Sequence, residues 1–381
     1  MSTQTYVFKL YNSKRNKSLH QTIDLAGCIW NHLISLHRRY YRLYNKPLNI
    51  YRLQKHITKL KKIKRFEKWN LLNSQSIQDI TERIDRAYKL FYQNRKRGVK
   101  TSPPKFKLIT KYRSFTLKQS GWKFSSSNRI MIQGKEYKYF KSRKTEGQIK
   151  TVTIKRDNLG DLWICFVVKK ENQIIQAKSG KIVGLDFGLN CFLTLSNGQK
   201  INNPLFLKQK IRLLKRLHKQ LNQKNPGSNQ YRKNILSLAR MHRKIDNQRK
   251  NFHFHVANAL AKQYNIIVVE DLNLRVMQKY WGRKVSDLGY AQFLKILEWV
   301  CLKHGSRMIK IDRYYPSSRI CSNCGYKREK LELFERNWVC SSCNYNHDRD
   351  INAAINIKRV GASTLNIEDV KPASTGCFHR C

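Results

Sequence analysis

Acidic residues are scarce in this chain of 381 residues. Asp and Glu number 24 against 77 Lys and Arg, which leaves a formal net charge of +53. Such a charge opposes compaction by self-repulsion unless a polyanion neutralises it. The cations recur from the N-terminus to about residue 310 and do not form one basic tail. This distribution favours nucleic acid over an anionic membrane surface as the partner.

Long apolar runs are absent as well. No run approaches the ~18 residues that a membrane span needs, and the first ten residues contain no apolar signal-peptide core. We therefore expect no membrane association and a cytoplasmic location, where thiols stay reduced. Six isolated cysteines are predicted to be ordinary thiols: Cys28, Cys165, Cys191, Cys301, Cys377 and Cys381.

The remaining four cysteines have the spacing of a metal site. Two residues separate Cys321 from Cys324, and the same spacing recurs in Cys340 and Cys343 after fifteen further residues. Each pair can face one ion, and the loop brings the second pair around to complete a tetrahedron. A redox pair or chance spacing is the alternative, which the repetition disfavours. We predict one structural zinc ion, because four thiolates leave no open coordination position.

The N-terminal half shows strand patterns on either side of a helical region. Short alternating stretches predict antiparallel strands within 105–175, and we expect them to form a β-barrel with the strand of residues 1–15. Apolar residues at helical spacing predict amphipathic helices within 16–104. The first helix is expected to start near Thr22 or Asp24.

After an expected linker at 173–180, the C-terminal half has the pattern of an α/β domain. One apolar strand ends at Asp186 and a second ends at Glu270, with two helices between them, the first of them basic. A helix and a strand follow, and Asp350 opens a further helix beyond the cysteine segment. This order of elements and acids is typical of an RNase H-like nuclease fold.

Each of these acids also has an ordinary explanation. Asp186 could close a simple turn, Glu270 could begin a loop, and Asp350 could cap a helix. Carboxylates at the ends of adjacent strands can instead converge on a shared Mg²⁺ site, because Mg²⁺ prefers oxygen ligands. Cleavage of a phosphodiester by two Mg²⁺ ions needs such a cluster.

Four segments of the chain strongly resemble the TnpB family, the transposon-encoded RNA-guided DNA endonucleases ancestral to type V CRISPR effectors. The segments are Gly184-Leu-Asp-Phe-Gly188, Ile267-Val-Val-Glu-Asp-Leu272, Tyr315-Pro-Ser-Ser-Arg-Ile-Cys-Ser-Asn-Cys-Gly325 and His347-Asp-Arg-Asp-Ile-Asn-Ala-Ala-Ile-Asn-Ile357. The resemblance covers nearly the whole chain.

The resemblance implies a multidomain α/β protein with an N-terminal β-barrel. The wedge-like barrel, 1–15 with 105–175, would contain an inserted helical recognition region, 16–104. A RuvC-like nuclease domain, 181–312 with 345–360, would contain an inserted zinc ribbon at 313–344, and a flexible tail would follow at 361–381.

The same resemblance implies a site and an activity. Asp186, Glu270 and Asp350 would be the catalytic triad and hold two Mg²⁺ ions, with Asp348 as a neighbour that is not a ligand. The protein, a monomer in a ribonucleoprotein of the bacterial cytoplasm and nucleoid, would bind a guide RNA derived from the transposon end. It would recognise a short motif beside a double-stranded DNA target and cut both strands at the one RuvC site. Pairing with the guide would supply sequence specificity, and a basic channel would hold the hybrid by its backbone. Gln78 resembles a position that reads the motif on DNA.

Three other functions stay open at this point. A guided DNA-binding protein without cleavage would be signalled by loss of a triad acid, and all three acids are present. Strand transfer by an acidic triad is chemically close to hydrolysis, although the resemblance favours cleavage. A plain zinc-ribbon RNA-binding module would leave the acids at the strand ends unexplained.

Overall fold

The computed structural model of the chain describes residues 2–170, 180–332 and 334–365. The chain divides into two compact units, Met1–Gln173 and Ile174–Cys381, and each is described by itself. The linker expected at 173–180 lies outside the described residues, except for Gly180. In the described part of the chain, no helix combines the length and the apolar character required to cross a membrane.

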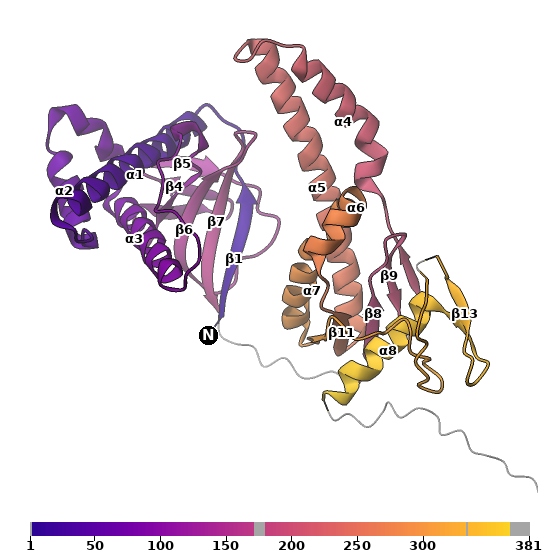
Figure 1. The fold of residues 1–381 in the computed structure, drawn as a ribbon. Coiled ribbons are helices and arrows are strands. Elements are labelled where there is room, and N and C mark those ends of the chain that lie inside the picture. Colours follow the sequence, from indigo (N-terminus) through magenta and orange to yellow (C-terminus); the bar gives the residue numbers. More distant parts are fainter. Residues whose placement is uncertain (1, 171–179, 333, 366–381) are drawn as a thin grey trace, which may run out of the picture. The chain divides into compact units, whose positions relative to one another are not determined.

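The first unit contains two antiparallel sheets and a group of helices (Figure 1). Its strands are β1 Ser2–Lys9, β2 Ser114–Leu117, β3 Trp122–Ser126, β4 Arg129–Ile132, β5 Lys135–Lys138, β6 Gln148–Arg156 and β7 Leu162–Lys170. Its helices are α1 Asn16–Tyr44, α2 Ile50–Leu60, η1 Lys64–Leu71, α3 Ser74–Lys96 and η2 Ile109–Lys111.

The strands of this unit pair as one sheet of order β1-β7-β6-β2 and another of order β3-β4-β5. A single bridge between Leu10 and Tyr139 links the end of β1 to the end of β5. Among the described residues, the pairings do not close the strands into one ring. The β-barrel expected from the sequence therefore stays a prediction.

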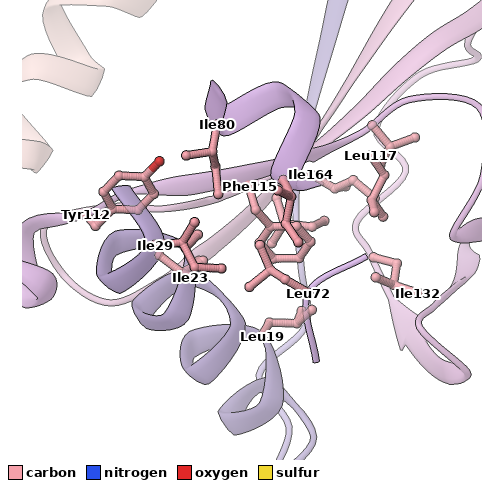
Figure 2. Packing of buried hydrophobic residues seen from close by; sticks show 14 of the residues in the cluster. Leu19, Ile23, Ile29, Leu72, Ile80, Tyr112, Phe115, Leu117, Ile132 and Ile164 are labelled. Atoms are coloured by element: carbon pink, nitrogen blue, oxygen red, sulfur yellow. The ribbon is translucent and has the colours of Figure 1, made fainter. Parts of the chain in front are cut away.

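The core of the first unit lies between the larger sheet and the helices (Figure 2). Residues of β7 alternate between buried and partly exposed, so that Ile164 and Phe166 point inward as a period of two requires. Ile23 and Ile29 of α1 and Ile80 of α3 meet them, all of them fully buried.

Helix α1 begins six to eight residues before the start expected near Thr22 or Asp24. Arg15 precedes its first residue, and no side chain caps the first turn, so the usual sequence signal of a helix start is missing. Leu19 and Ile23 are nevertheless buried against the sheet. Tertiary packing extends the helix here, because most helical stability in proteins comes from burying an apolar face.

The second unit is built on a mixed sheet of order β10-β9-β8-β11-β12. The strands are β8 Ile182–Asp186, β9 Cys191–Leu195, β10 Lys200–Asn202, β11 Ile266–Glu270 and β12 Arg307–Ile311. Strands β8, β11 and β12 run parallel, and β9 and β10 are antiparallel to their neighbours. The helices are α4 Phe206–Asn222, α5 Asn229–Gln263, α6 Leu274–Leu288, α7 Tyr290–His304 and α8 Arg349–Ser363.

Helices cover both faces of this sheet, which explains the continuous apolar runs of its central strands. Val183 and Leu185 of β8 belong to the core shared with α5 and α7. Ile182 of β8 and Val268 of β11 belong instead to the core formed with Ile357 of α8. Alternate residues of one strand thus meet helices on opposite faces, and the unit has three layers.

Helices α4 and α5 form a long hairpin that extends beyond the sheet of the second unit (Figure 1). Helix α4 carries six Lys and Arg and no acid, and α5 carries eight against the single acid Asp246. Leu214 is the buried residue of α4, and α5 buries its C-terminal half against α7 and the sheet. The hairpin therefore presents two strongly basic helices to solvent.

The cysteine segment folds between β12 and α8. It contains a short antiparallel pair, β13 Asn337–Val339 and β14 Asn346–Asp348, and α8 follows β14 directly. Helix α8 continues to Ser363, past the expected start of the tail at 361, because Gly361 and Ala362 pack into the core beside Val268. The rest of the predicted tail, 366–381, lies outside the described residues.

Candidate metal centre and carboxylate site

Two acidic residues end neighbouring parallel strands of the second unit. Asp186 is the last residue of β8, and Glu270 is the last residue of β11. Leu185 and Val269 are partners in the register of these strands, so the acids that follow them stand at the same level. Both carboxyl groups consequently belong to the C-terminal edge of the sheet, where ligands of open α/β sheets bind.

A third acid approaches this edge from α8. Asp350 lies in the first turn of α8, which packs directly on β8. A Cβ atom at Gly184 would come within 2.1 Å of the Ala354 carbonyl oxygen and 2.5 Å of the Lys358 nitrogen. Only glycine allows two backbones to approach this closely. Gly184 therefore sets the distance between the helix that carries Asp350 and the strand that carries Asp186.

The electrostatics of Asp186 show that Asp350 and Glu270 are its neighbours. Burial, followed by the negative charges of Asp350 and Glu270, raises the pKa of Asp186 to about 7. Burial, followed by the charge of Asp271, raises the pKa of Glu270 to about 7. Like charges that share a site disfavour each other's ionisation, and a cation between them reverses that effect. The arrangement suits a positively charged ligand.

The carboxylates nevertheless stand further apart than the cysteine sulfurs. Among the described residues, the four cysteines are the group whose ligand atoms lie close enough to hold a metal ion, all within 4.8 Å of one another. Asp186, Glu270 and Asp350 do not form such a group.

Asp348 is held by other partners. Its Oδ2 lies 2.7 Å from the ammonium of Lys200 on β10, and its Oδ1 accepts the backbone amides of Asp350 and Ile351 at 3.0 Å each. Burial opposes its ionisation, but the Lys200 ammonium and these amides outweigh burial and lower the pKa of Asp348. Asp348 thus caps α8 as an N-cap residue does.

Two further side chains shape the edge of the site, and sequence reasoning missed both. Nη1 of Arg336, from the cysteine segment, lies 3.4 Å from Oδ1 of Asp350. Tyr290 donates its hydroxyl to the carbonyl of Gly188 and lies 3.1 Å from the carbonyl oxygen of Phe192, which fixes the turn after Asp186. Neither residue stands in a motif, so no sequence signal pointed to it.

The four cysteines form two knuckles of the same shape. The amide of Gly325 donates to the carbonyl of Cys321, and the amide of Asn344 donates to the carbonyl of Cys340, both at 2.9 Å. Gly325 and Asn344 both have positive φ, 82° and 53°. Glycine and asparagine are the residues that adopt this conformation most readily.

The sulfurs of the two knuckles fit a tetrahedral metal ion. Sγ of Cys321 lies 3.6 Å from Sγ of Cys343, and Sγ of Cys324 lies 3.6 Å from Sγ of Cys340. Zinc–sulfur bonds of about 2.3 Å in a tetrahedron place the sulfurs roughly 3.8 Å apart. The backbone amide of Tyr345 lowers the pKa of Cys343 to about 6, whereas burial raises that of Cys321 to about 12, and a bound cation would favour the thiolate of both. The cluster can therefore hold a metal such as zinc.

The cysteine segment is fastened to α8 by two buried asparagines. Asn352 accepts the amide of Ser322 at 2.8 Å and donates to the carbonyl of Ile320 at 2.8 Å. Asn356 donates to the carbonyls of Ser317 and Ile320 at 2.8 and 2.6 Å. Four such bonds on buried groups make the segment and the helix one rigid piece.

Gln78, the predicted DNA-reading residue, is distant in sequence from both clusters and belongs to the first unit. It lies in the second turn of α3 and is half-buried. The role predicted for it is not tested by its position.

Taken together, fold and site define an α/β protein whose sheet presents acidic residues at one edge. A four-cysteine cluster that can hold a metal ion is joined to α8, the helix that carries Asp350. Residues 165–280 match the family model described as "Probable transposase" (OrfB_IS605). Residues 290–357 match the model described as the TNB domain of Cas12f1-like proteins.

Curated relatives confirm the resemblance to the TnpB family. A Streptomyces pristinaespiralis protein named "Putative RNA-guided DNA endonuclease" is 33% identical over 55% of this chain and 52% of its own length. InsQ of Escherichia coli (strain K12), which has the same description, is 26% identical over 77% of this chain and 75% of its own length. The TnpB-like protein L79 of Acanthamoeba polyphaga mimivirus is 27% identical over 56% of this chain and 43% of its own length. The chain thus spans about half the length of the first of these relatives.

A solved structure has the same fold. The structure of the mini-RNA-guided endonuclease CRISPR-Cas_phi3 aligns with 94% of this chain and 92% of its own, with a TM-score of 0.53 and 11% sequence identity. At that identity the likeness concerns the fold alone.

Proposed function

We propose that this protein is an RNA-guided DNA endonuclease that cuts both strands of its target at one RuvC-like site. The observation that carries the proposal is the meeting of Asp186, Glu270 and Asp350 at one edge of the sheet, where the negative charges of Asp350 and Glu270 act on Asp186. The relatives named as RNA-guided DNA endonucleases support the same activity.

The topology of the second unit supports an RNase H-like fold. In sequence order its strands are arranged 3-2-1-4-5, and the second strand is antiparallel to the first. Strands β8 and β11 lie side by side although a two-helix hairpin separates them in sequence. The cysteine segment would then be a zinc ribbon inserted before α8, the helix that carries the third acid.

The sulfurs of Cys321, Cys324, Cys340 and Cys343 fit one structural zinc ion. Asp186, Glu270 and Asp350 supply the oxygen ligands that Mg²⁺ prefers, and they would hold two Mg²⁺ ions once their carboxylates draw closer around them. Two Mg²⁺ ions, when bound, activate water and stabilise the leaving oxygen of a phosphodiester.

The side chains around the carboxylates have their own tasks. Asp186 and Glu270 must lose their protons before they can act as ligands, since burial holds both pKa values at about 7. Asp348 stays engaged with Lys200 and the start of α8, which leaves Asp350 as the acid that faces Asp186. Arg336 forms an ion pair with Asp350, and this pair must weaken or break when a cation binds to Asp350.

Charge supports the proposed nucleic-acid partners, a guide RNA from the transposon end and a double-stranded DNA target. A net charge of +53 matches a ligand with one phosphate per nucleotide. The basic hairpin of α4 and α5 supplies cations on the nuclease unit. The first unit, as a wedge-like domain with helices, would recognise the target-adjacent motif, with Gln78 as a reading residue.

The decisive experiment is cleavage by the protein purified with its co-expressed RNA. A plasmid library would carry a matching target beside randomised flanks. The wild type is expected to cut in Mg²⁺, and Asp186→Ala is expected to bind RNA and target normally without cutting. Glu298→Gln is the matched control, since this acid lies exposed on α7. Cleavage by Asp186→Ala in Mg²⁺ would show that the triad is assigned wrongly.

A second function, guided DNA binding without cleavage, is favoured by one observation. The three carboxylates do not converge as closely as the cysteine sulfurs do, among the described residues. Target binding by the wild type with no cleavage at any Mg²⁺ concentration would establish this alternative.

A further inference from the structure

His347 makes a contact that the metal site itself does not require. Its Nε2 lies 3.0 Å from Sγ of Cys321, and the residue is 3% exposed. The four sulfurs already complete a tetrahedron, which leaves no position for a fifth ligand. A buried nitrogen at hydrogen-bond distance from a metal-ligating sulfur therefore needs another explanation.

Packing fixes the direction of the His347 ring. The ring lies 4.6 Å from that of Trp338 and 4.8 Å from that of Tyr345, between centroids. Trp338 and His347 are also direct partners in the pairing of β13 with β14. With two aromatic neighbours and a strand register to hold it, the imidazole has little freedom to turn away from Cys321.

The chemistry of the pair assigns the donor. A cysteine that ligates a cation does so as a thiolate, which can only accept hydrogen bonds. The contact is therefore an Nε2–H donor of His347 directed at the thiolate of Cys321. Cys321 also lies 3.4 Å from the backbone amide nitrogens of Asn323 and Cys324, which donate to its sulfur. Outer donors of this kind orient ligands and hold them on the metal.

His347 is also close in sequence to the proposed active site. It is followed by Asp348, which caps α8, and the cap is followed within the first turn by Asp350. The side chain of Asn352, on α8, forms hydrogen bonds with Ile320 and Ser322, the residues on either side of Cys321. A displacement of Cys321 would thus be transmitted to α8 by two routes, through His347 and through Asn352.

We propose that His347 is a positioning residue that holds the Cys321 thiolate on the metal by an Nε2–H hydrogen bond. In doing so it joins the metal site to the start of the helix that carries Asp350. The first part rests only on metal binding by the four cysteines. The second part rests on the proposed nuclease function.

The test compares three full-length variants, His347→Gln, His347→Phe and Tyr345→Phe. Glutamine keeps an N–H donor near the position of Nε2, phenylalanine keeps the ring but loses the donor, and Tyr345→Phe controls for a change in the aromatic packing. Each protein is loaded with Zn²⁺, and release to a colorimetric chelator is followed without nucleic acid.

We expect His347→Phe to release zinc on the order of 10-fold to 100-fold faster than the wild type, the usual effect of losing such a donor. His347→Gln should recover most of the difference, and Tyr345→Phe should match the wild type. Replacing zinc by Co²⁺ provides a second readout, because loss of the hydrogen bond should shift the thiolate-to-cobalt charge-transfer band. If His347→Phe does not fold, His347→Leu takes its place.

Three results would overturn the proposal. Zinc release from His347→Phe at the wild-type rate would show that the bond does not hold the ligand. Equal release from the Gln and Phe variants would show that the ring packs but does not donate. Retention of zinc by Cys321→Ser but not by Cys321→Ser with His347→Phe would show that His347 is a ligand.

Cleavage is measured separately on the same proteins. Lower cleavage by His347→Phe at saturating Zn²⁺, recovered in His347→Gln, would support the link to Asp350. Wild-type cleavage by His347→Phe would remove that link. Failure of the wild type to cut would remove the proposed function, while the zinc-release result would still decide the role of His347.

Discussion

Two carboxyl groups with pKa values near neutrality lie at the edge of the mixed sheet. Folding raises the pKa of Asp186 from 3.8 to about 7 and that of Glu270 from 4.5 to about 7, in both cases chiefly by burial. Between about pH 4 and pH 7 the folded protein therefore binds more protons at these residues than the unfolded chain. Their contribution to stability is present at low pH and is lost as pH rises through 7.

This sign leads to a prediction for the metal-free protein. Thermal unfolding between pH 5.5 and pH 8 should show a drop in stability that the double variant Asp186→Asn, Glu270→Gln lacks. We expect a difference of roughly 2–4 kcal/mol, or about 4–16 °C in a unit of this size. Comparing the variant with the wild type cancels the titration of the histidines. If stability falls with pH equally in the variant and the wild type, the raised pKa values of Asp186 and Glu270 are contradicted.

The same protons compete with cations. Ligand carboxyls must be ionised, so cation binding to Asp186 and Glu270 should strengthen with pH. At sub-saturating Mg²⁺, cleavage is expected to increase from pH 6 to pH 8 by about tenfold or more, and at saturating Mg²⁺ the increase should shrink. The Mg²⁺ concentration for half-maximal cleavage, measured at each pH, checks this. A half-maximal concentration independent of pH would show that these protons are not displaced.

Asp348 and Asp350 illustrate how residues of one type receive different roles. Both stand in the segment from His347 to Ile357, and sequence reasoning relied on the family resemblance to choose between them. In the structure, Asp348 pairs with Lys200 and accepts a backbone amide at the start of α8. The charge of Asp350 instead raises the pKa of Asp186. The choice depends on Lys200, which lies 148 residues away in sequence.

At the scale of the element, the contact of α8 with the sheet sets the geometry of the site. Gly184 of β8 contacts the backbone of α8, and Gly361 of α8 contacts Val268 of β11. The sheet and the helix thus each contribute one glycine to this contact. A Cβ at Gly361 would come within 2.3 Å of the Val268 side chain. The helix can therefore lie against the strands at a distance that no larger residue permits.

Gly184→Ala should consequently destabilise the second unit. The new methyl group would meet the Ala354 carbonyl and the Lys358 nitrogen, which cannot move without moving α8. We expect a loss of about 2 kcal/mol or more, measured by urea unfolding, together with lower cleavage. Gly282→Ala is the matched control, because nothing lies within 4 Å of the place its methyl group would occupy and its stability should stay equal or rise. Equal stability of Gly184→Ala and the wild type would show that α8 is not held this closely.

At the scale of the whole molecule, net charge would dominate the proposed interaction with nucleic acid. The affinity for a polyanion should fall steeply with salt, with a slope that counts the phosphates neutralised. Helix α4 has no acid to neutralise its cations internally. Its lysines are therefore available to phosphates.

A variant with Lys208, Lys210, Lys215 and Lys219 changed to Gln tests this helix. The slope of log affinity for guide RNA against log salt should decrease in magnitude by about 0.7–0.9 for each lysine that contacts a phosphate. Lys89→Gln with Lys330→Gln is the control, because these lysines are already paired with Asp85 and Glu332. A slope as steep as in the wild type would place the RNA elsewhere on the molecule.

Much of the local structure was predictable from sequence, since it depends on neighbours along the chain. Strands β2 Ser114–Leu117 and β4 Arg129–Ile132 lie within 105–175, where short alternating stretches predict antiparallel strands. Helix α6, Leu274–Leu288, was missed entirely. Its backbone departs from helical geometry at Trp281, where two shorter helical stretches meet at a kink.

The sequence by itself determined the net charge, the spacing of the four cysteines and the strands that end in Asp186 and Glu270. These follow from composition and local periodicity. Only the tertiary structure decided which acid faces Asp186, where α1 begins, and that His347 meets Cys321. Those features depend on contacts between residues far apart in the chain. Such contacts are set by how strands register and how closely helices can approach, which no local pattern records.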